Sequence, residues 1–455
     1  MKNSRAKIVI MLLLFFFQIL LTPKQKFHCG VAERMTSRLL VINNINIIPM
    51  TKNAVLKNKT VVIKDGTISE IRDEPVSTSF NSLIVDGSGR YLIPGLADMH
   101  VHISSRKDSE LFVANGVTTV QNMWGTEGFL NFLGFPNQLN YKMQVNDETL
   151  TGPTIYTAGP VLEGRPKDHP FMQEITTWDK AKKTITNQVK QGYDFIKVYD
   201  HLSEEVYQSL IEECQRLDVM VKGHVPYEVG LEKTIRAGQR QIDHLTGFLD
   251  YDSVKLLVPE DSLRYYAAMA RNNRVYNCPT IIFTQKRVLL GDFTEMAENH
   301  QEIRYLSFMQ RFFLRQSIKA LEDELKYQGN DYRKDVFDLY RKVIICLREQ
   351  NAPLLAGTDT GNPFVFPGFS LHEELEQLVK AGLTPFEALA CATVNPFESI
   401  DMLNEAGTIE PGKKADLVIL RKNPLLDIKN TKEIESVILR GKLLNQDDLR
   451  RLLEY

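Results

Sequence analysis

The nine residues PGLADMHVH, at positions 94–102, contain the pattern that decides the fold. An apolar run from Leu96 ends in His100 and His102, which are separated by one residue. Side chains two apart in a β-strand point to the same side, so both imidazoles can face one site at the end of the strand. A His-x-His pair also occurs on ordinary surfaces and in satisfied core pairs. The pair therefore indicates a metal site only if other ligand-type residues end neighbouring strands.

Strand-like and helix-like segments alternate through the rest of the central region, which is typical of a parallel α/β fold. In one helical segment Val206, Leu210, Cys214 and Leu217 recur at spacings of three to four after the capping residue Ser203. Strands are expected at Leu96–His102, Thr118–Met123, Thr154–Ala158, Phe195–Tyr199, Met220–His224, Gln241–Leu245, Val275–Ile282 and Leu354–Thr358. Eight strands with helices between them, in about 300 residues, predict a (β/α)8 barrel of the TIM type.

Ligand-type residues stand at the ends of several of these strands, where barrels of this kind place their active sites. Lys197 is near the end of the fourth strand, His224 and His244 are in the fifth and sixth, and Asp359 follows the eighth. Imidazole and carboxylate groups are good zinc ligands, and a catalytic zinc ion keeps one position for water. The pattern predicts a metal-dependent enzyme.

Lys197 lies inside the apolar run FIKV at 195–198. Burying an unpaired ammonium costs several kcal/mol and favours the neutral amine. A neutral amine can react with carbon dioxide to give a carbamate, whose two oxygens can bridge two cations. Alternatively, Lys197 extends to solvent or pairs with Asp194 or Asp200. Ligand-type residues at five separate strand ends favour the metal site.

The segment 94–102 resembles the first-strand motif of the amidohydrolase superfamily, and the resemblance extends from Leu39 to Leu444. Further segments resemble the imidazolonepropionase-like branch, which includes metal-dependent dipeptidases and ochratoxinase-type amidases. They are GVTTV at 116–120, FIK at 195–197, GH at 223–224, IDH at 242–244, AGTDT at 356–360, GFSLHEEL at 368–375 and GLTPFEAL at 382–389.

The resemblance implies two divalent metal ions, expected to be Zn²⁺, held by six protein ligands: His100, His102, Lys197, His224, His244 and Asp359. His100, His102 and Asp359 would hold one ion, and His224 and His244 the other. Lys197, carboxylated by carbon dioxide, would bridge both ions together with a hydroxide. Asp359 would also serve as the general base. Bound zinc can bring the pKa of water from 15.7 to about 7.

The expected reaction is hydrolysis of an amide or peptide bond in a small substrate, such as a dipeptide or an N-acyl amino acid. Hydrolysis of a cyclic amide, a lactone or an organophosphate on the same metals is the alternative within enzymes. A mononuclear site with unmodified Lys197 is a further variant. An inactive binding protein is disfavoured because all six ligands are present.

Two residues are candidates for substrate contact. His169, with Arg165 and Lys167, belongs to a loop at 163–170 that could meet an anionic substrate or could simply be solvated. Tyr227 follows His224, where dipeptidase relatives can use a tyrosine to contact a substrate carboxylate, although Pro226 shifts the local pattern. His372 is expected to be a structural helix residue near the site.

The segments on both sides of the central region have the pattern of short β-strands. Strand-like runs flank Asp65-Gly66, a strong hairpin signal, and further runs occur at 415–420 and 434–439. We expect residues 36–93 and 405–445 to form a small β-sandwich domain, and residues 94–404 to form the metal-dependent hydrolase barrel. Chain ends that lie close together allow such a domain.

The N-terminal residues 1–30 have the features of an export signal. Lys2, Arg5 and Lys7 precede an apolar stretch at 8–21, shorter than the roughly 20 residues that span a bilayer. The pattern predicts a signal peptide or, because no small-x-small cleavage site follows, an N-terminal membrane anchor. The protein is therefore expected to be periplasmic, secreted or membrane-anchored.

The overall composition excludes little else. A net charge of −2 gives no electrostatic reason to expect nucleic-acid binding. Five scattered cysteines without CxxC spacing disfavour a disulfide framework and a zinc ribbon. The sequence leaves the oligomeric state open, a homo-oligomer included.

Overall fold

The computed structural model describes residues 39–77, 82–126, 131, 136–250, 255–289, 300–306, 310–311, 314–315 and 330–454. The N-terminal segment interpreted as an export signal lies outside these residues. Within the described ranges, no helix is both long and apolar enough to cross a membrane.

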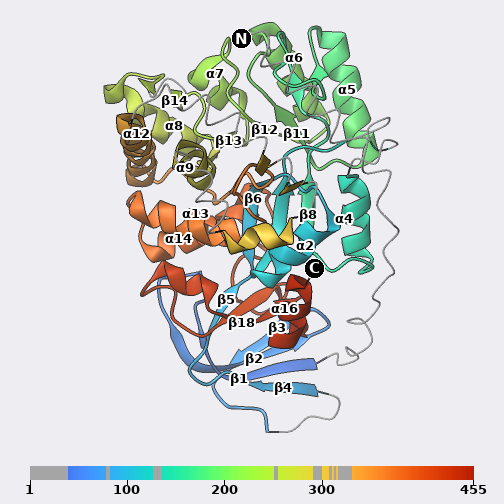
Figure 1. The fold of residues 1–455 in the computed structure, drawn as a ribbon, viewed down its shortest axis with the longest axis vertical. Helices are drawn as coiled ribbons and strands as arrows, with labels where there is room; N and C mark the ends of the chain where they lie inside the picture. The colour runs from blue at the N-terminus through green and yellow to red at the C-terminus, as the bar shows by residue number, and fades with distance from the viewer. Residues whose placement is uncertain are drawn as a thin grey trace.

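Two parallel sheets form the central region (Figure 1). The first contains β6 (Leu96–Val101), β7 (Val117–Asn122) and β8 (Thr154–Thr157). The second has the order β10-β9-β11-β12-β13-β16. Its strands are β9 (Leu162–Glu163), β10 (Gln173–Glu174), β11 (Phe195–Val198), β12 (Met220–Gly223), β13 (Gln241–Asp243) and β16 (Tyr276–Cys278). Every neighbouring pair in both sheets is parallel, so the predicted α/β class is confirmed.

Single parallel bridges connect the two sheets and the segment that follows helix α12 (Asn330–Glu349). Ala158 pairs with Phe195, Asn277 with Leu354, and Val101 with Thr360. The segment 354–360 is thus hydrogen-bonded on both sides, with Leu355 N donating to Asn277 O at 2.9 Å and Asp359 N donating to His100 O at 2.7 Å.

Two of the eight predicted strands differ from the structure. Leu354–Thr358 makes only an isolated bridge at Leu354, and the chain then turns into the left-handed region at Asp359, where φ is 60°. The strand predicted at Val275–Ile282 ends at Cys278, because Pro279 has no N–H to donate and Thr280 has a φ of 50°. Helix α9 (Ile281–Leu289) begins directly afterwards.

Helices surround these strands. They are α2 (Arg106–Ala114), α4 (Gln138–Asn146), α5 (Trp178–Gln191), α6 (Glu204–Arg216), α7 (Gly230–Ala237), α8 (Leu263–Asn272), α9, α12 (Asn330–Glu349), α13 (Phe369–Lys380), α14 (Pro385–Cys391) and α15 (Val394–Ser399). Helix α6 follows its prediction: the Ser203 side chain accepts from Val206 N at the start of the helix, and Val206, Leu210 and Cys214 are buried. A short hairpin, β14 (Leu249–Asp250) with β15 (Lys255–Leu256), lies before α8.

Strands from both ends of the described chain share one eight-stranded sheet, seen in blue and red in the lower part of Figure 1. Its order is β19-β18-β17-β5-β1-β2-β3, with β4 also paired to β1. The strands are β1 (Leu39–Ile47), β2 (Leu56–Lys64), β3 (Thr67–Arg72), β4 (Ser82–Asp86), β5 (Tyr91–Pro94), β17 (Leu417–Leu420), β18 (Ile434–Leu439) and β19 (Lys442–Leu444). The pairings place all of them in a single sheet, so the two sheets of the predicted sandwich are not shown. Helix α16 (Gln446–Leu453) follows and packs on α2.

The predicted hairpin between β2 and β3 is confirmed. Asp65 and Gly66 both have positive φ, at 48° and 80°. A two-residue hairpin turn with both central residues in this region suits the twist of the strands it joins.

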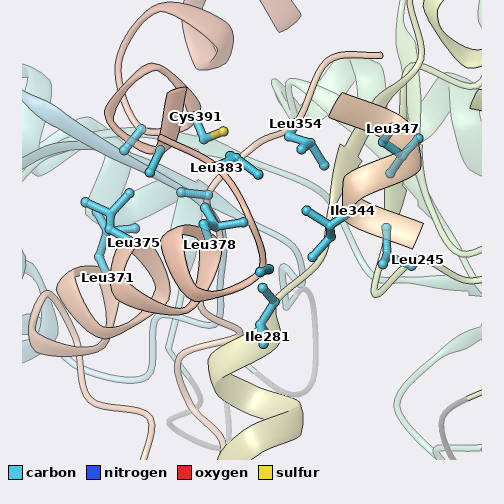
Figure 2. Close-up of a cluster of buried hydrophobic side chains, with 14 of the residues drawn as sticks. Leu245, Ile281, Ile344, Leu347, Leu354, Leu371, Leu375, Leu378, Leu383 and Cys391 are labelled. Atoms are coloured by element: carbon cyan, nitrogen blue, oxygen red, sulfur yellow. The ribbon is translucent and has the colours of Figure 1, made fainter. Parts of the chain in front are cut away.

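A large apolar core fixes the outer helices near the site. Figure 2 shows Leu371, Leu375 and Leu378 of α13 facing side chains that come from several other elements. These partners include Ile281, Ile344, Leu347, Leu383 and Cys391. Each fully buried side chain of this size contributes roughly 1.5–3 kcal/mol. The cysteines in the described part of the chain, Cys214, Cys278, Cys346 and Cys391, are free and buried.

His372 on α13 connects three elements inside the protein. Its Nδ1 lies 3.0 Å from Thr431 Oγ1 and its Nε2 lies 3.1 Å from Asn115 O. Burial, with a smaller contribution from Lys432, lowers the pKa of His372 to about 4. Both ring nitrogens have protein partners, which supports the structural role expected for this residue.

This burial predicts acid sensitivity. In the unfolded chain His372 binds a proton below about pH 6.5, whereas in the folded protein it does so only below about pH 4. The stability that His372 contributes above pH 6.5 is therefore lost as the pH falls between these two values. The full loss from this residue is about 3 kcal/mol. Urea unfolding at pH 7 and pH 4.5 measures it. His372→Gln should lower stability at pH 7 but lose less on acidification than the wild type, and equal losses in both proteins would contradict the assignment.

Candidate active site

His100, His102 and Asp359 meet where β6 lies beside the segment 354–360. His102 Nε2 is 2.9 Å from Asp359 Oδ1, and His100 Nε2 is 3.4 Å from the same oxygen. One ligand atom from each residue lies within 4.8 Å of the others. His100 and Asp359 are buried, whereas the His102 side chain is 30% exposed. The group is therefore reached from solvent on the side of His102.

His244 and His224 extend this group toward β13 and β12. The ring centroids of His100 and His244 are 4.7 Å apart, and those of His244 and His224 are 5.0 Å apart. Both residues follow the last residue of their strand. The structure thus brings the four histidines expected from the sequence into one continuous row, with Asp359 at one end.

Partners on Nδ1 orient two of these rings. His224 Nδ1 lies 2.9 Å from Asp200 Oδ1, and His244 Nδ1 lies 2.6 Å from Thr280 Oγ1. The Thr280 hydroxyl donates to Pro279 O, so it accepts from His244 Nδ1–H. The ionised Asp200 carboxylate can only accept, so it accepts from His224 Nδ1–H. Both rings therefore keep the Nε2 lone pair available for a cation.

Backbone strain is concentrated at the same place. His244 and Asp359 have φ values of 56° and 60°, and Thr280 has 50°. Residues other than glycine rarely adopt this region, and each such conformation costs on the order of 1–3 kcal/mol. Packing of the surrounding residues offsets this strain and holds the three side chains in place.

Lys197 lies deep in β11 and is only 3% exposed. Its Nζ donates to Asp243 Oδ2. Neither partner proposed from the sequence is its neighbour here, since Asp194 pairs with Lys142 and Asp200 contacts His224. The alternative that Lys197 extends to solvent is likewise wrong, because the side chain is buried.

Asp243 connects Lys197 to the histidine row. Its Oδ1 is 3.3 Å from His100 Nδ1, and the Gln241 amide donates to the same oxygen at 2.7 Å. Burial would raise the pKa of Asp243, but the Lys197 ammonium and the His100 ring hold the pKa well below its usual value. Asp243 is thus a buried anion between a predicted bridging lysine and a predicted metal ligand.

The electrostatics leave His100 and His244 neutral and the Asp359 carboxylate charged. Burial lowers the pKa of His100 and lowers that of His244 well below its usual value. Burial opposes ionisation of Asp359, yet His100 and His102 hold its pKa below the usual range. Neutral imidazole and ionised carboxylate are the forms that bind metal ions.

The geometry around Asp359, independently of the sequence pattern, also indicates that His100, His102 and Asp359 suit a metal ion. Asp359 Oδ1 is buried and has no well-aligned hydrogen bond, although two imidazole nitrogens approach it. A buried carboxylate oxygen without an aligned donor is unfavourable unless a cation lies beside it, because buried polar atoms normally have partners. These residues could therefore hold a metal ion.

Two supporting residues were not found by sequence reasoning. Thr280, which contacts His244, follows a proline and belongs to no recognisable motif. Glu374 on α13 accepts from Ile281 N and Ile282 N, at 3.1 and 2.7 Å, and so caps the start of α9 directly after Thr280. Acceptor oxygens at a helix N-terminus satisfy N–H groups that have no partner within the helix, but only the fold brings Glu374 to this helix.

The two predicted substrate residues differ in position. Tyr227 is 65% exposed, with its ring 5.4 Å from that of His201. His169 is half-buried, and its ring centroid is 5.0 Å from Trp124, which in turn is 6.4 Å from His102. Of the two, His169 has the shorter path of contacts to the histidine row.

A surface cavity of about 400 Å³ lies elsewhere, between α6 and α7. It is lined by residues such as Tyr207, Ile211 and Lys233 and contains none of the predicted metal ligands.

Comparison with known proteins agrees with this arrangement. The model of the amidohydrolase family matches residues 91–444. This chain belongs to the amidohydrolase family. As a member of the family it is a hydrolase related to enzymes that act on carbon–nitrogen bonds of small molecules, and amidohydrolases typically bind metal ions.

The proteins to which this chain is similar are distant in sequence. Ochratoxinase from Aspergillus niger is 23% identical over 443 residues, covering 84% of this chain and 81% of the relative. An adenine deaminase from Desulforamulus reducens is 24% identical and covers 90% of this chain but 57% of the relative. Among solved structures, a bottromycin amidohydrolase has a TM-score of 0.74 at 22% identity, covering 97% of this chain and 92% of that one. A Xaa-Pro dipeptidase has a TM-score of 0.66 at 19% identity, covering 90% and 100%. At these identities the structural matches show the fold alone.

Proposed function

We propose that this amidohydrolase is a metal-dependent enzyme that hydrolyses an amide or peptide bond in a small substrate, such as a dipeptide or an N-acyl amino acid. The observation that carries the proposal is the row of four imidazoles that ends at the ionised carboxylate of Asp359. A bottromycin amidohydrolase and a Xaa-Pro dipeptidase are among the proteins with a similar fold, which supports amide chemistry.

The architecture that we propose for the central region is a closed (β/α)8 barrel. The three single bridges would join β8 to β11, β16 to Leu354, and Thr360 to β6, so that eight strand positions form a ring. All predicted ligands then lie at the carboxyl ends of these positions, where such barrels place their active sites.

The residues suit two metal positions. His100, His102 and Asp359 would hold one divalent ion and His224 and His244 the other, with Zn²⁺ favoured by the nitrogen-rich donor set. Lys197, carboxylated and released from Asp243, would bridge the two. When bound, such ions polarise a carbonyl and lower the pKa of water.

Side chains of the protein would then transfer the proton of the attacking water. Asp359 is ionised and lies beside the partly exposed His102, so it is placed to take a proton from an attacking water and give it to the leaving nitrogen. Positioned acid–base catalysis of this kind contributes about 10²–10⁴-fold. Asp243 and Asp200 would hold the His100 and His224 rings during this transfer.

A substrate panel tests the proposed reaction. Purified protein with added Zn²⁺ is assayed against dipeptides, N-acyl amino acids, cyclic amides, lactones and an organophosphate. Hydrolysis of the open-chain amides should exceed that of the other classes. Preference for a lactone or an organophosphate would replace the proposal with the alternative reaction on the same residues.

Thr280 should control the metal affinity of the His244 position. Thr280→Val removes the hydroxyl that accepts from His244 Nδ1 while keeping the shape of the side chain. Loss of a partner of this kind typically costs 10–100-fold in metal affinity. Competition with a chromophoric chelator should show that loss in Thr280→Val, whereas the matched variant Thr280→Ser should keep near wild-type affinity. If Thr280→Val bound metal as tightly as Thr280→Ser, the Thr280 hydroxyl would not control metal affinity at the His244 position.

A further inference from the structure

Aromatic side chains extend outward from the exposed side of the histidine row. The ring centroid of Trp124 is 6.4 Å from that of His102, His169 is 5.0 Å from Trp124, and Phe171 is 5.1 Å from His169. All three are partly exposed. We call Trp124, His169 and Phe171 the aromatic wall. Because His102 is the exposed member of the row, the wall borders the side from which a substrate would arrive.

The wall carries no positive charge at neutral pH. His169 Nδ1 accepts from Phe171 N at 3.3 Å. Burial, helped by Lys167, lowers the pKa of His169 to about 4. His169 therefore presents a neutral ring, with its remaining N–H on Nε2. It does not supply the cation that an anionic substrate group would need.

The cations of the same loop are engaged elsewhere. Arg165 pairs with Glu174 at 2.8 Å. Lys167 Nζ donates to the carbonyls of Pro170 and Met172, at 3.1 and 3.2 Å. The cations of the loop at 163–170 therefore hold the local structure, and the loop presents the His169 ring beside the site.

The position of Trp124 is fixed by its backbone. Asn122 Nδ2 donates to Trp124 O at 2.9 Å, and Gly125 N donates to Gly159 O at 3.1 Å. A Cβ at Gly125 would lie 2.4 Å from Ala158 O, so only glycine permits this close approach. The segment is thus built to hold the indole where it stands.

We propose that the aromatic wall binds an uncharged aromatic group of the substrate next to the scissile amide, so that the preferred substrates are amides with an aromatic side chain. This inference rests on the proposed function. Offset and edge-on ring contacts, added to burial of apolar surface, favour an aromatic over a methyl side chain. The expected preference is about tenfold or more in affinity, since tenfold corresponds to about 1.4 kcal/mol.

The chain offers a direct reporter, because it contains two tryptophans, Trp124 and Trp178. Trp178 is on α5, is 44% exposed and has Lys182 over its ring. Trp178→Phe leaves Trp124 as the single indole. Fluorescence titrations of this variant, freed of metal with a chelator and again with Zn²⁺, use N-acetylphenylalanine and N-acetylalanine as probes. N-acetylphenylalanine should give a saturable change at a concentration at least about tenfold lower than N-acetylalanine needs.

Two further variants complete the test. Trp124→Ala in the wild-type background should lose the preference for aromatic over alanyl N-acyl substrates, measured as the ratio of kcat/KM, while Trp124→Phe should keep most of it. Circular dichroism confirms that both variants fold. Equal binding of the two probes, or an unchanged ratio in Trp124→Ala, would overturn the proposal. Selective binding without hydrolysis of any amide would support the wall and refute the proposed function, so the two fail separately.

Discussion

Asp359→Asn should lower kcat by about 10²–10⁴-fold on whichever amide the wild type hydrolyses. The substitution keeps the size of the side chain but removes the negative charge and the group that exchanges the proton. Asp359 is buried and contacts both His100 and His102. KM should change much less than kcat, since the interaction is used in the transition state.

The assay for Asp359→Asn needs two controls. Zn²⁺ is kept in excess and bound metal is counted, so that loss of a ligand is separated from loss of the base. Asp261→Asn, at an exposed position in the 3-10 helix Glu260–Ser262, provides the matched substitution and should leave kcat unchanged. Activity of Asp359→Asn within a few-fold of the wild type would exclude the proposed general base.

Lys197→Ala should lose most of its bound metal and nearly all activity. The variant removes the proposed bridge. In the metal-free protein, where Lys197 is uncarboxylated, it also leaves Asp243, which is fully buried, without its cation. Removing one partner of a buried ion pair typically costs 3–5 kcal/mol of stability. A lower melting temperature is therefore expected together with the loss of metal.

A double variant separates folding from metal binding. Lys197→Ala combined with Asp243→Asn removes both charges, so the uncompensated buried anion is gone and most of the thermal stability should return. Metal content should remain low, because the bridge is still absent. Full metal content and activity in either variant would refute the bridging role of Lys197.

The sequence predicted the strand ends well because buried strands and their terminal ligands are local patterns. His100, His102, His224, His244 and Asp359 were expected together, and the structure places them in one row. The extent of the strands was less predictable. Asp359 and Thr280 adopt left-handed backbone conformations that end the predicted strands. Their residue types alone do not predict these conformations.

The partner of Lys197 shows why pairings escape such reasoning. Asp194 and Asp200 are close to Lys197 in sequence. However, β11, β12 and β13 lie side by side, so Asp243 of β13 reaches Lys197 of β11 across the intervening strand β12. Glu374, which caps α9 from α13, is separated from Ile282 by 92 residues. The eight-stranded sheet is a similar case, since its strands were recognisable but their order depends on contacts between the two ends of the chain.

The metal content of the purified wild-type protein tests the central proposal most directly. Elemental analysis after growth with zinc, and after removal of loosely bound ions, should find about two divalent ions per chain, with His244→Asn reducing that number. A protein without bound metal, or one that keeps a single ion unaffected by His244→Asn, would contradict the two-metal site.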